Sequence, residues 1–348
     1  MKKILFISIF IQLILLESSY SIESVYKTDF YQVDINEGFI QDAKEKEINR
    51  IKIQSFDTII TKILTKDEIL KLSKFSKVEN NIDLIIQSIL IENEFISQKK
   101  YKANIKINFN YIELINLLRK YKINYTDYQS PDYLLLVAEK KLFSKEGLSK
   151  VNSFYKKKQI NKYGLINFIY PYLSTNDRFL IPYDKIIHKN KSSLKNIANK
   201  YKTNFILLVL IEHKNNIINF DISVFTSHND QITSVNNFFI ENKLNYEIYL
   251  YNFLNNWWKK NNLINNSIIN NVKCFIKNSN IHELNFINSK INSISQVKSN
   301  KLNQINLGLN INEIIFYGNI KNLISKLSYE RIALQINSDM DCLIQVSN

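Results

Sequence analysis

The sequence contains little glycine, proline, histidine or cysteine. Its 348 residues include 5 Gly, 3 Pro, 4 His and 2 Cys. Neither the phosphate-binding loop G-x-x-x-x-G-K-[ST] nor the dinucleotide motif G-x-G-x-x-G occurs. The nucleophile elbow G-x-S-x-G is also absent. These absences exclude the common glycine-rich nucleotide sites and the elbow of an α/β-hydrolase, whereas a Ser/His/Asp triad of another kind stays open.

The few histidines and cysteines form no metal-binding pattern. The histidines are His188, His213, His228 and His282, and no two of them have a spacing such as H-x-x-x-H. The two cysteines are also far apart in the chain. Structural zinc sites need closely spaced ligands of these types. We therefore expect no metal site and no cofactor, and we assign no catalytic residue from the sequence.

Residues 1–21 have the three parts of a secretory signal peptide. Two lysines follow Met1, an apolar run covers residues 4–16, and Ser19 and Ser21 occupy positions −3 and −1 for cleavage after Ser21. A bilayer span needs about 20 apolar residues, so this run is too short for a membrane anchor, and no later segment reaches that length. No cysteine follows the run, which argues against a lipid anchor. We expect an exported, periplasmic protein without a transmembrane helix in the mature chain.

The formal charge of +14 indicates a basic protein. Asn, Lys and Ile are abundant, as AT-rich codons would produce, and the lysines are scattered. The densest cluster is only Lys156-Lys157-Lys158. For an exported chain we expect no binding to nucleic acid. An envelope protein or polymer is the expected partner, and peripheral contact with an anionic membrane surface stays open.

Hydrophobic periodicity predicts an α+β protein in which three small α/β-sandwich domains follow the signal peptide. The expected domains cover residues 22–128, 129–264 and 265–348. The first combines a long helix over 39–64 with a hairpin of strands 88–97 and 101–109. Strict alternation in the second strand indicates one buried and one solvated face. Ser130-Pro131 is the strongest boundary signal in the chain.

The central and last domains show different patterns. In the central domain we expect a strand over 133–137, a helix over 145–160, an extended segment over 168–173, a helix over 192–201, strands over 205–211, 217–226 and 235–241, and a helix over 245–260. The strand 205–211 is continuously apolar, which is typical of burial on both faces. In the last domain, strands over 272–277, 302–310, 312–317, 332–336 and 342–346 surround helices over 281–294 and 320–329. Their β-α-β-β-α-β order predicts a ferredoxin-like unit.

A few residues deserve individual interpretation. Asp177 is the most site-like acid, because it lies in the polar segment Ser174–Arg178 after an extended segment; turn formation with a surface ion pair is the favoured explanation. Trp257-Trp258 is interpreted as core, with a domain or partner interface as the alternative. Cys274 and Cys342 lie in strands of the last domain. An oxidising compartment permits a disulfide between them, but we favour two small buried hydrophobic residues.

The order of elements resembles a proteobacterial exported family called domain of unknown function 2066. The resemblance rests on the signal peptide, the strand 30–35 before a long helix, the hairpin 91–109, the helix 111–123 before Pro131, Leu194–Tyr201 running into an apolar strand, and Phe316-Tyr317-Gly318 before a helix. The family's Pro-led acidic loop is only loosely matched at Pro171–Asp177. The resemblance implies no activity.

We therefore expect a non-catalytic periplasmic binding or envelope-accessory module. The alternative is a periplasmic hydrolase that acts on envelope polymers. A pocket that holds Asp177 or a histidine with a second polar partner would favour the hydrolase, and an exposed apolar surface would favour the binding module.

Overall fold

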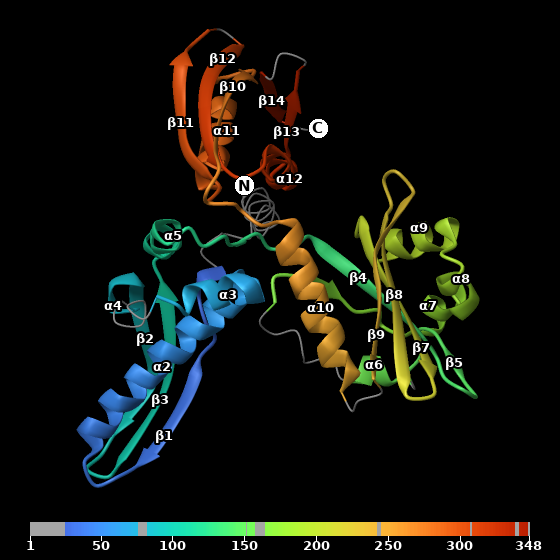
Figure 1. The fold of residues 1–348 in the computed structure, drawn as a ribbon, viewed down its shortest axis with the longest axis horizontal. Coiled ribbons are helices and arrows are strands. Elements are labelled where there is room, and N and C mark those ends of the chain that lie inside the picture. The colour runs from blue at the N-terminus through green and yellow to red at the C-terminus, as the bar shows by residue number, and fades with distance from the viewer. Residues whose placement is uncertain are drawn as a thin grey trace, which may run out of the picture.

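The computed structural model describes residues 25–75, 82–150, 152–156, 164–241, 245–306, 308–337 and 341–346. The predicted signal peptide over 1–21 lies outside these residues. The strands form three separate sheets, and helices pack beside them, as Figure 1 shows. The predicted α+β class is therefore confirmed. We call them the N-terminal sheet (β1–β3), the central sheet (β4–β9) and the C-terminal sheet (β10–β14).

The N-terminal sheet has the order β1-β3-β2, and both pairs are antiparallel. Its strands are β1 (Tyr31–Asn36), β2 (Ile86–Ile96) and β3 (Lys100–Phe109). The long helix α2 (Ile40–Ile63) lies along one face, where Ile51, Ile59 and Ile63 are buried against alternate residues of β3. The helices α3 (Lys66–Leu72), α4 (Ile82–Ile85) and α5 (Tyr111–Lys120) complete this part. The Asn110 side chain caps α5.

The central sheet has the strand order β5-β4-β7-β8-β9, and β6 pairs with β4. Its strands are β4 (Asp132–Lys140), β5 (Lys145–Glu146), β6 (Asn167–Ile169), β7 (Phe205–Lys214), β8 (Ile217–Thr226) and β9 (Gln231–Glu241). One face carries α7 (Thr175–Leu180), α8 (Tyr183–Ile187) and α9 (Lys191–Lys200), and the other carries α10 (Tyr246–Asn261) and the short α6 (Ser153–Lys156) (Figure 1). Because helices cover both faces over this part of the sheet, β4 between its ends and Ile206–Val209 of β7 are apolar and buried.

The C-terminal sheet has the order β11-β12-β10-β14-β13. Its strands are β10 (Ile269–Lys277), β11 (Val297–Gln304), β12 (Leu309–Tyr317), β13 (Ile332–Ile336) and β14 (Cys342–Val346), with helices α11 (Ile281–Ser293) and α12 (Ile320–Tyr329). The predicted β-α-β-β-α-β order is present. The last strand, β14, lies between β10 and β13 and is parallel to β10, which adds a fifth strand to the expected ferredoxin-like arrangement.

Cys274 and Cys342 form a disulfide, which corrects the interpretation that we favoured from the sequence. The two residues lie directly opposite each other in the parallel β10–β14 pair, with Cα atoms 4.4 Å apart. This distance suits a disulfide. The sequence could not reveal the pairing, because it depends on β14 lying next to β10.

Two segments differ from the sequence prediction, and each difference involves a glycine. The predicted helix over 145–160 is replaced at its start by β5 and a turn at Gly147, where an added Cβ would lie 3.3 Å from the Tyr183 backbone. The predicted strand over 302–310 is shifted to Val297–Gln304. Gly308 has a φ of +80°, which L-residues rarely adopt, and it turns the chain into β12.

The three sheets meet around a buried ion pair. Lys326 of α12 places its Nζ 3.6 Å from Asp127 Oδ1, and both side chains are almost fully buried. Tyr26 donates its hydroxyl hydrogen to Asp127 Oδ2 at 3.0 Å. Arg119 of α5 donates to the Ser295 carbonyl at 2.6 Å. Polar contacts, together with ring contacts of Tyr329 with Tyr128 and Phe205, therefore join the C-terminal sheet to the rest of the molecule.

Candidate functional site

The strands β4, β7, β8 and β9 leave part of one sheet face uncovered at one end of the central sheet. We call this region, at the β4–β5 and β7–β8 turns, the distal end. Two hollows lie there and share Asn219 and Phe239. The larger, with a volume of about 530 Å³, is called the groove, and the smaller, with about 450 Å³, is called the tip hollow.

The floor of the groove consists of two rows of side chains that cross four strands. Directly paired residues of neighbouring strands share a face of a sheet. The inner row is Ala138, Leu210, Asp221 and Asn237, and the outer row is Lys140, Glu212, Asn219 and Phe239. The helix α8 forms the wall through Tyr183 and Ile187, which lie one turn apart. Because α8 is only five residues long, the rows beyond it stay open.

Ion pairs fix the charged side chains of the groove. Glu212 accepts hydrogen bonds from Lys214 at 2.8 Å and from Lys140 at 2.9 Å. These two contacts lower the pKa of Glu212, although partial burial acts in the opposite direction. Lys189 Nζ lies 3.0 Å from Asp221 Oδ2. A glycoside hydrolase needs one carboxyl group that holds a proton as general acid. Glu212 is held as a carboxylate, which does not suit the role of general acid.

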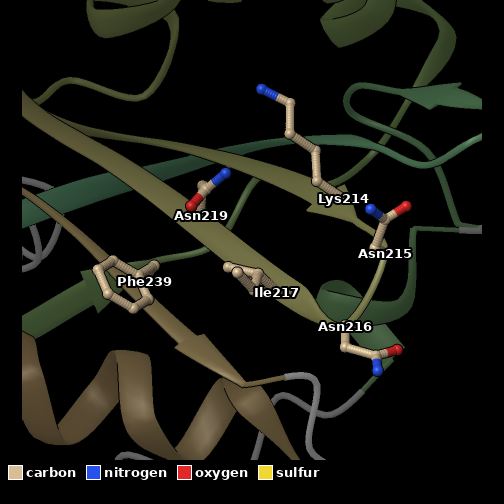
Figure 2. A pocket seen from close by; sticks show the side chains of 6 residues that line it. All are labelled: Lys214, Asn215, Asn216, Ile217, Asn219 and Phe239. Atoms are coloured by element: carbon tan, nitrogen blue, oxygen red, sulfur yellow. The ribbon is translucent and has the colours of Figure 1, made fainter.

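The tip hollow lies beside the β7–β8 turn. Figure 2 shows Ile217 and Phe239 on neighbouring strands, with Asn215 and Asn216 at the turn and the Lys214 side chain extending away from it. Asn215 has a φ of +51°, a conformation that Asn tolerates in tight turns. Phe239 is 71% exposed although it lies within a strand. The hollow therefore combines an apolar floor with hydrogen-bond donors at its rim.

On the opposite face of the distal end, Glu139 organises a small polar cluster. Its side chain has 0% exposure and points toward α10. Tyr246 donates its hydroxyl hydrogen to Glu139 Oε1 at 2.8 Å, and His213 Nε2 lies 2.7 Å from the same oxygen. Lys141 Nζ lies 3.4 Å from Oε2. Because a carboxylate only accepts hydrogen bonds, the His213–Glu139 contact is one in which Nε2 donates.

The Glu139–His213 pair is a carboxylate–imidazole dyad, an arrangement that orients a general base in many enzymes. Neither the groove nor the tip hollow is lined by His213 or Tyr246. No serine or cysteine hydrogen-bonds to His213 in the described part of the chain. The sequence missed this pair, because Glu139 and His213 are brought together only by the parallel pairing of β4 and β7.

Asp177, the acid that the sequence singled out, lies outside both hollows. It closes a capping box at the start of α7, in which Ser174 N donates to Asp177 Oδ2 at 2.9 Å and Asp177 N donates to Ser174 Oγ at 3.1 Å. Lys200 Nζ lies 2.5 Å from Asp177 Oδ1. Burial raises the pKa of Asp177, but the contacts with Lys200 and Ser174 lower it more, so the net shift is downward. These contacts give Asp177 a structural role.

The other residues singled out from the sequence are dispersed. His188 ends α8, His228 lies in the β8–β9 turn and His282 lies in α11, and all three are exposed. Trp258 is buried, donates its indole N–H to the Tyr128 carbonyl at 2.7 Å and stacks on the Tyr128 ring. It therefore belongs to the core at the joint between the N-terminal and central sheets.

No group of three or more His, Cys, Asp or Glu side chains in the described part of the chain is arranged to hold a metal ion. Among the described helices, none is long and apolar enough to span a membrane.

Comparisons with known proteins give little further information. No protein-family model matches the chain, and no curated protein matches it. A solved structure with detectable similarity is the LpoB C-terminal domain from Salmonella enterica. It is 10% identical, with a TM-score of 0.23, and the match covers 33% of this chain and 84% of that one. At this TM-score the similarity carries no argument about fold or function.

Proposed function

We propose that this chain is an exported, non-catalytic accessory protein of the cell envelope that binds a protein or polymer partner in the groove. The observation that carries the proposal is the uncovered floor of the groove. Its apolar side chains, Leu210 and Phe239, share one sheet face with the amides of Asn219 and Asn237 and with three charged side chains. Binding sites of this kind combine apolar area with a few fixed polar groups.

Two further features support export. The signal sequence over residues 1–21 directs a chain out of the cytoplasm. A disulfide such as Cys274–Cys342 persists in oxidising compartments and is rare in the cytosol. A periplasmic location accounts for both. The predicted relation to domain of unknown function 2066 adds no activity to this proposal.

Site-specific photocrosslinking in the exporting cell tests the proposal. A photoreactive residue at Tyr183, in the groove wall, should give a discrete adduct with an envelope component. The same residue at Phe179 is the matched control, because Phe179 is 84% exposed and lies outside the groove lining. Adding Leu210→Glu should abolish the Tyr183 adduct while the protein level is unchanged. Equal adducts at both positions, or persistence after Leu210→Glu, would overturn groove binding.

The Glu139–His213 dyad supports the alternative function, a hydrolase of envelope polymers. That function predicts release of soluble fragments from purified wall material by the exported protein. It also predicts that His213→Gln abolishes release, whereas the charge-conserving variant Glu139→Asp only reduces it. Our proposal expects no release by any of these proteins. Release that depends on His213 would replace the accessory function with the enzymatic one.

A further inference from the structure

The β4–β5 turn carries two adjacent apolar side chains that project from the distal end. Leu142 is 82% exposed and Phe143 is 95% exposed, the highest value among the large apolar side chains of the described residues. The turn is closed by a hydrogen bond from Lys141 N to the Ser144 carbonyl at 2.8 Å. Leaving this much apolar surface in water is unfavourable unless another phase covers it.

Lysines flank the exposed pair Leu142 and Phe143. Lys140, Lys141 and Lys145 flank it in the segment KKLFSK, and no acidic residue lies within two positions of Leu142 or Phe143. Lys140 is paired with Glu212 and Lys141 contacts the buried Glu139, so their charges are partly compensated. The remaining positive charge favours an anionic surface over a neutral one. Leu142 and Phe143 supply most of the apolar area that such a surface would bury.

The neighbouring turn extends the same end of the sheet. Lys140 lies opposite Glu212 in the β4–β7 pairing, which places the β4–β5 turn beside the β7–β8 turn at the lower right of Figure 1. There Ile217 is 42% exposed and Phe239 is 71% exposed, with Lys214 and two asparagines at the rim of the tip hollow (Figure 2). Apolar side chains with cationic and amide neighbours at their base suit the boundary between lipid headgroups and acyl chains.

We infer that the distal end docks peripherally on an anionic phospholipid bilayer, with Leu142 and Phe143 inserted below the headgroups. The inference deepens the proposed envelope function and rests on export. Two adjacent side chains on a convex turn favour a fluid lipid surface, which needs no complementary pocket. The formal charge of +14 attracts an anionic surface before contact. The groove shares Lys140 and Phe239 with this end, whereas its wall at Tyr183 and Ile187 lies on α8 and stays available to another partner.

Vesicle flotation tests the inference with protein purified from the exporting cells, so that its N-terminus is the natural one. The protein should float with vesicles that contain phosphatidylglycerol and much less with pure phosphatidylcholine. The variant Leu142→Ser/Phe143→Ser should lower the partition coefficient at least about tenfold. The variant Lys141→Gln/Lys145→Gln should lower it several-fold, less than the roughly 25-fold of two uncompensated lysines at about fivefold each, because Glu139 partly compensates Lys141.

The matched control removes equally exposed apolar side chains elsewhere. Leu84 and Phe179 are 74% and 84% exposed, and Leu84→Ser/Phe179→Ser should bind vesicles as the natural chain does. Lipids brominated along the acyl chain should quench the additional fluorescence of Phe143→Trp. Failure of the natural chain to float, or floating of Leu142→Ser/Phe143→Ser at the natural level, would overturn membrane docking. A protein adduct at Phe143 without vesicle binding would do the same, and the crosslinking test at Tyr183 would be unaffected.

Discussion

The N-terminal and central sheets are joined differently from the C-terminal sheet. The first two contribute to one continuous apolar core, in which side chains of α2 and β3 and those of β4, β7 and α10 belong to the same cluster. The C-terminal sheet has its own core around Cys274, Ile287 and Ile344. Its contacts with the rest include the Lys326–Asp127 ion pair and hydrogen bonds to the Ser295 carbonyl.

This difference indicates two units of stability. Apolar surface shared between two sheets makes each dependent on the other, because separating them exposes the whole interface. A sheet with a separate core can open without breaking the shared core, although it then loses the ring contacts of Tyr317 and Tyr329 with the rest of the molecule. We expect the N-terminal and central sheets to unfold together and the C-terminal sheet to unfold separately.

Removing the disulfide should have the largest effect and should separate the two units. The double variant Cys274→Ala/Cys342→Ala releases a loop whose ends are 68 residues apart in sequence. For a loop of that length, removing the disulfide should lower the free energy of unfolding by about 4 kcal/mol. Hydrogen exchange should accelerate in β10, β12 and β14 and stay unchanged in β3 and β7.

A reducing agent should reproduce the effect on the natural chain and leave the double variant unaffected. If exchange accelerates equally in all three sheets, the C-terminal sheet is not an independent unit, and the comparison fails.

Lys326→Met should have the next largest effect, because it removes one partner of the buried ion pair. Asp127 is then left as a buried charge, with Tyr26 still donating to it. Losing one member of such a pair costs about 3 kcal/mol. Local opening measured by hydrogen exchange should increase in α12 and around Tyr125. The double variant Asp127→Asn/Lys326→Met should lose less than Lys326→Met alone; equal losses would show that the charges do not interact.

Lys259, which lies between the N-terminal and central sheets, should make the stability of this joint depend on pH. It is buried in α10 and donates to the carbonyls of Thr61 and Leu64 at 2.7 and 2.8 Å. Burial, and to a smaller extent Lys66, lowers its pKa to about 8. Between that value and the ordinary lysine pKa the unfolded chain binds more protons than the folded one, so stability rises with pH. From pH 8 to 9.5 the gain is about 1.5 kcal/mol.

The measurement is chemical unfolding followed by Trp fluorescence, with Lys259→Met as the reference at each pH. The reference also removes the contribution of the tyrosines, which begin to ionise toward the upper end of this pH range. As pH rises, the free energy of unfolding of the natural chain should increase relative to that of Lys259→Met. A constant difference would mean that Lys259 binds its proton equally in both states.

Regular patterns made much of the fold predictable from the sequence. The alternation in β3 and the spacing of Ile51, Ile59 and Ile63 in α2 predicted elements that the structure confirms within one or two residues. What failed depended on contacts between distant segments. Gly147 fits against the Tyr183 backbone, and the Cys274–Cys342 disulfide requires β14 beside β10. Neither contact leaves a local signal in the sequence.

The distal end was not predictable for the same reason. Its groove exists because α8 ends early, and the sequence analysis did not predict α8 at all. Glu139, His213 and Tyr246 come from three elements that meet only in the folded chain. Asp177 attracted attention because acidic residues in polar segments are common both in sites and at helix N-termini, and sequence alone does not separate these roles.

Ser174→Ala should have the smallest effect and should stay local to α7. It removes the oxygen that accepts from Asp177 N, and loss of such a cap costs about 1 kcal/mol. Asn176→Ala is the matched control, because Asn176 is exposed and lies in the same turn. Ser174→Ala, but not Asn176→Ala, should lower the free energy of unfolding of the joint N-terminal and central unit. Hydrogen exchange in the C-terminal sheet should not change. A response in β12 as large as in α7 would show that the central and C-terminal sheets are coupled more tightly than their separate cores indicate.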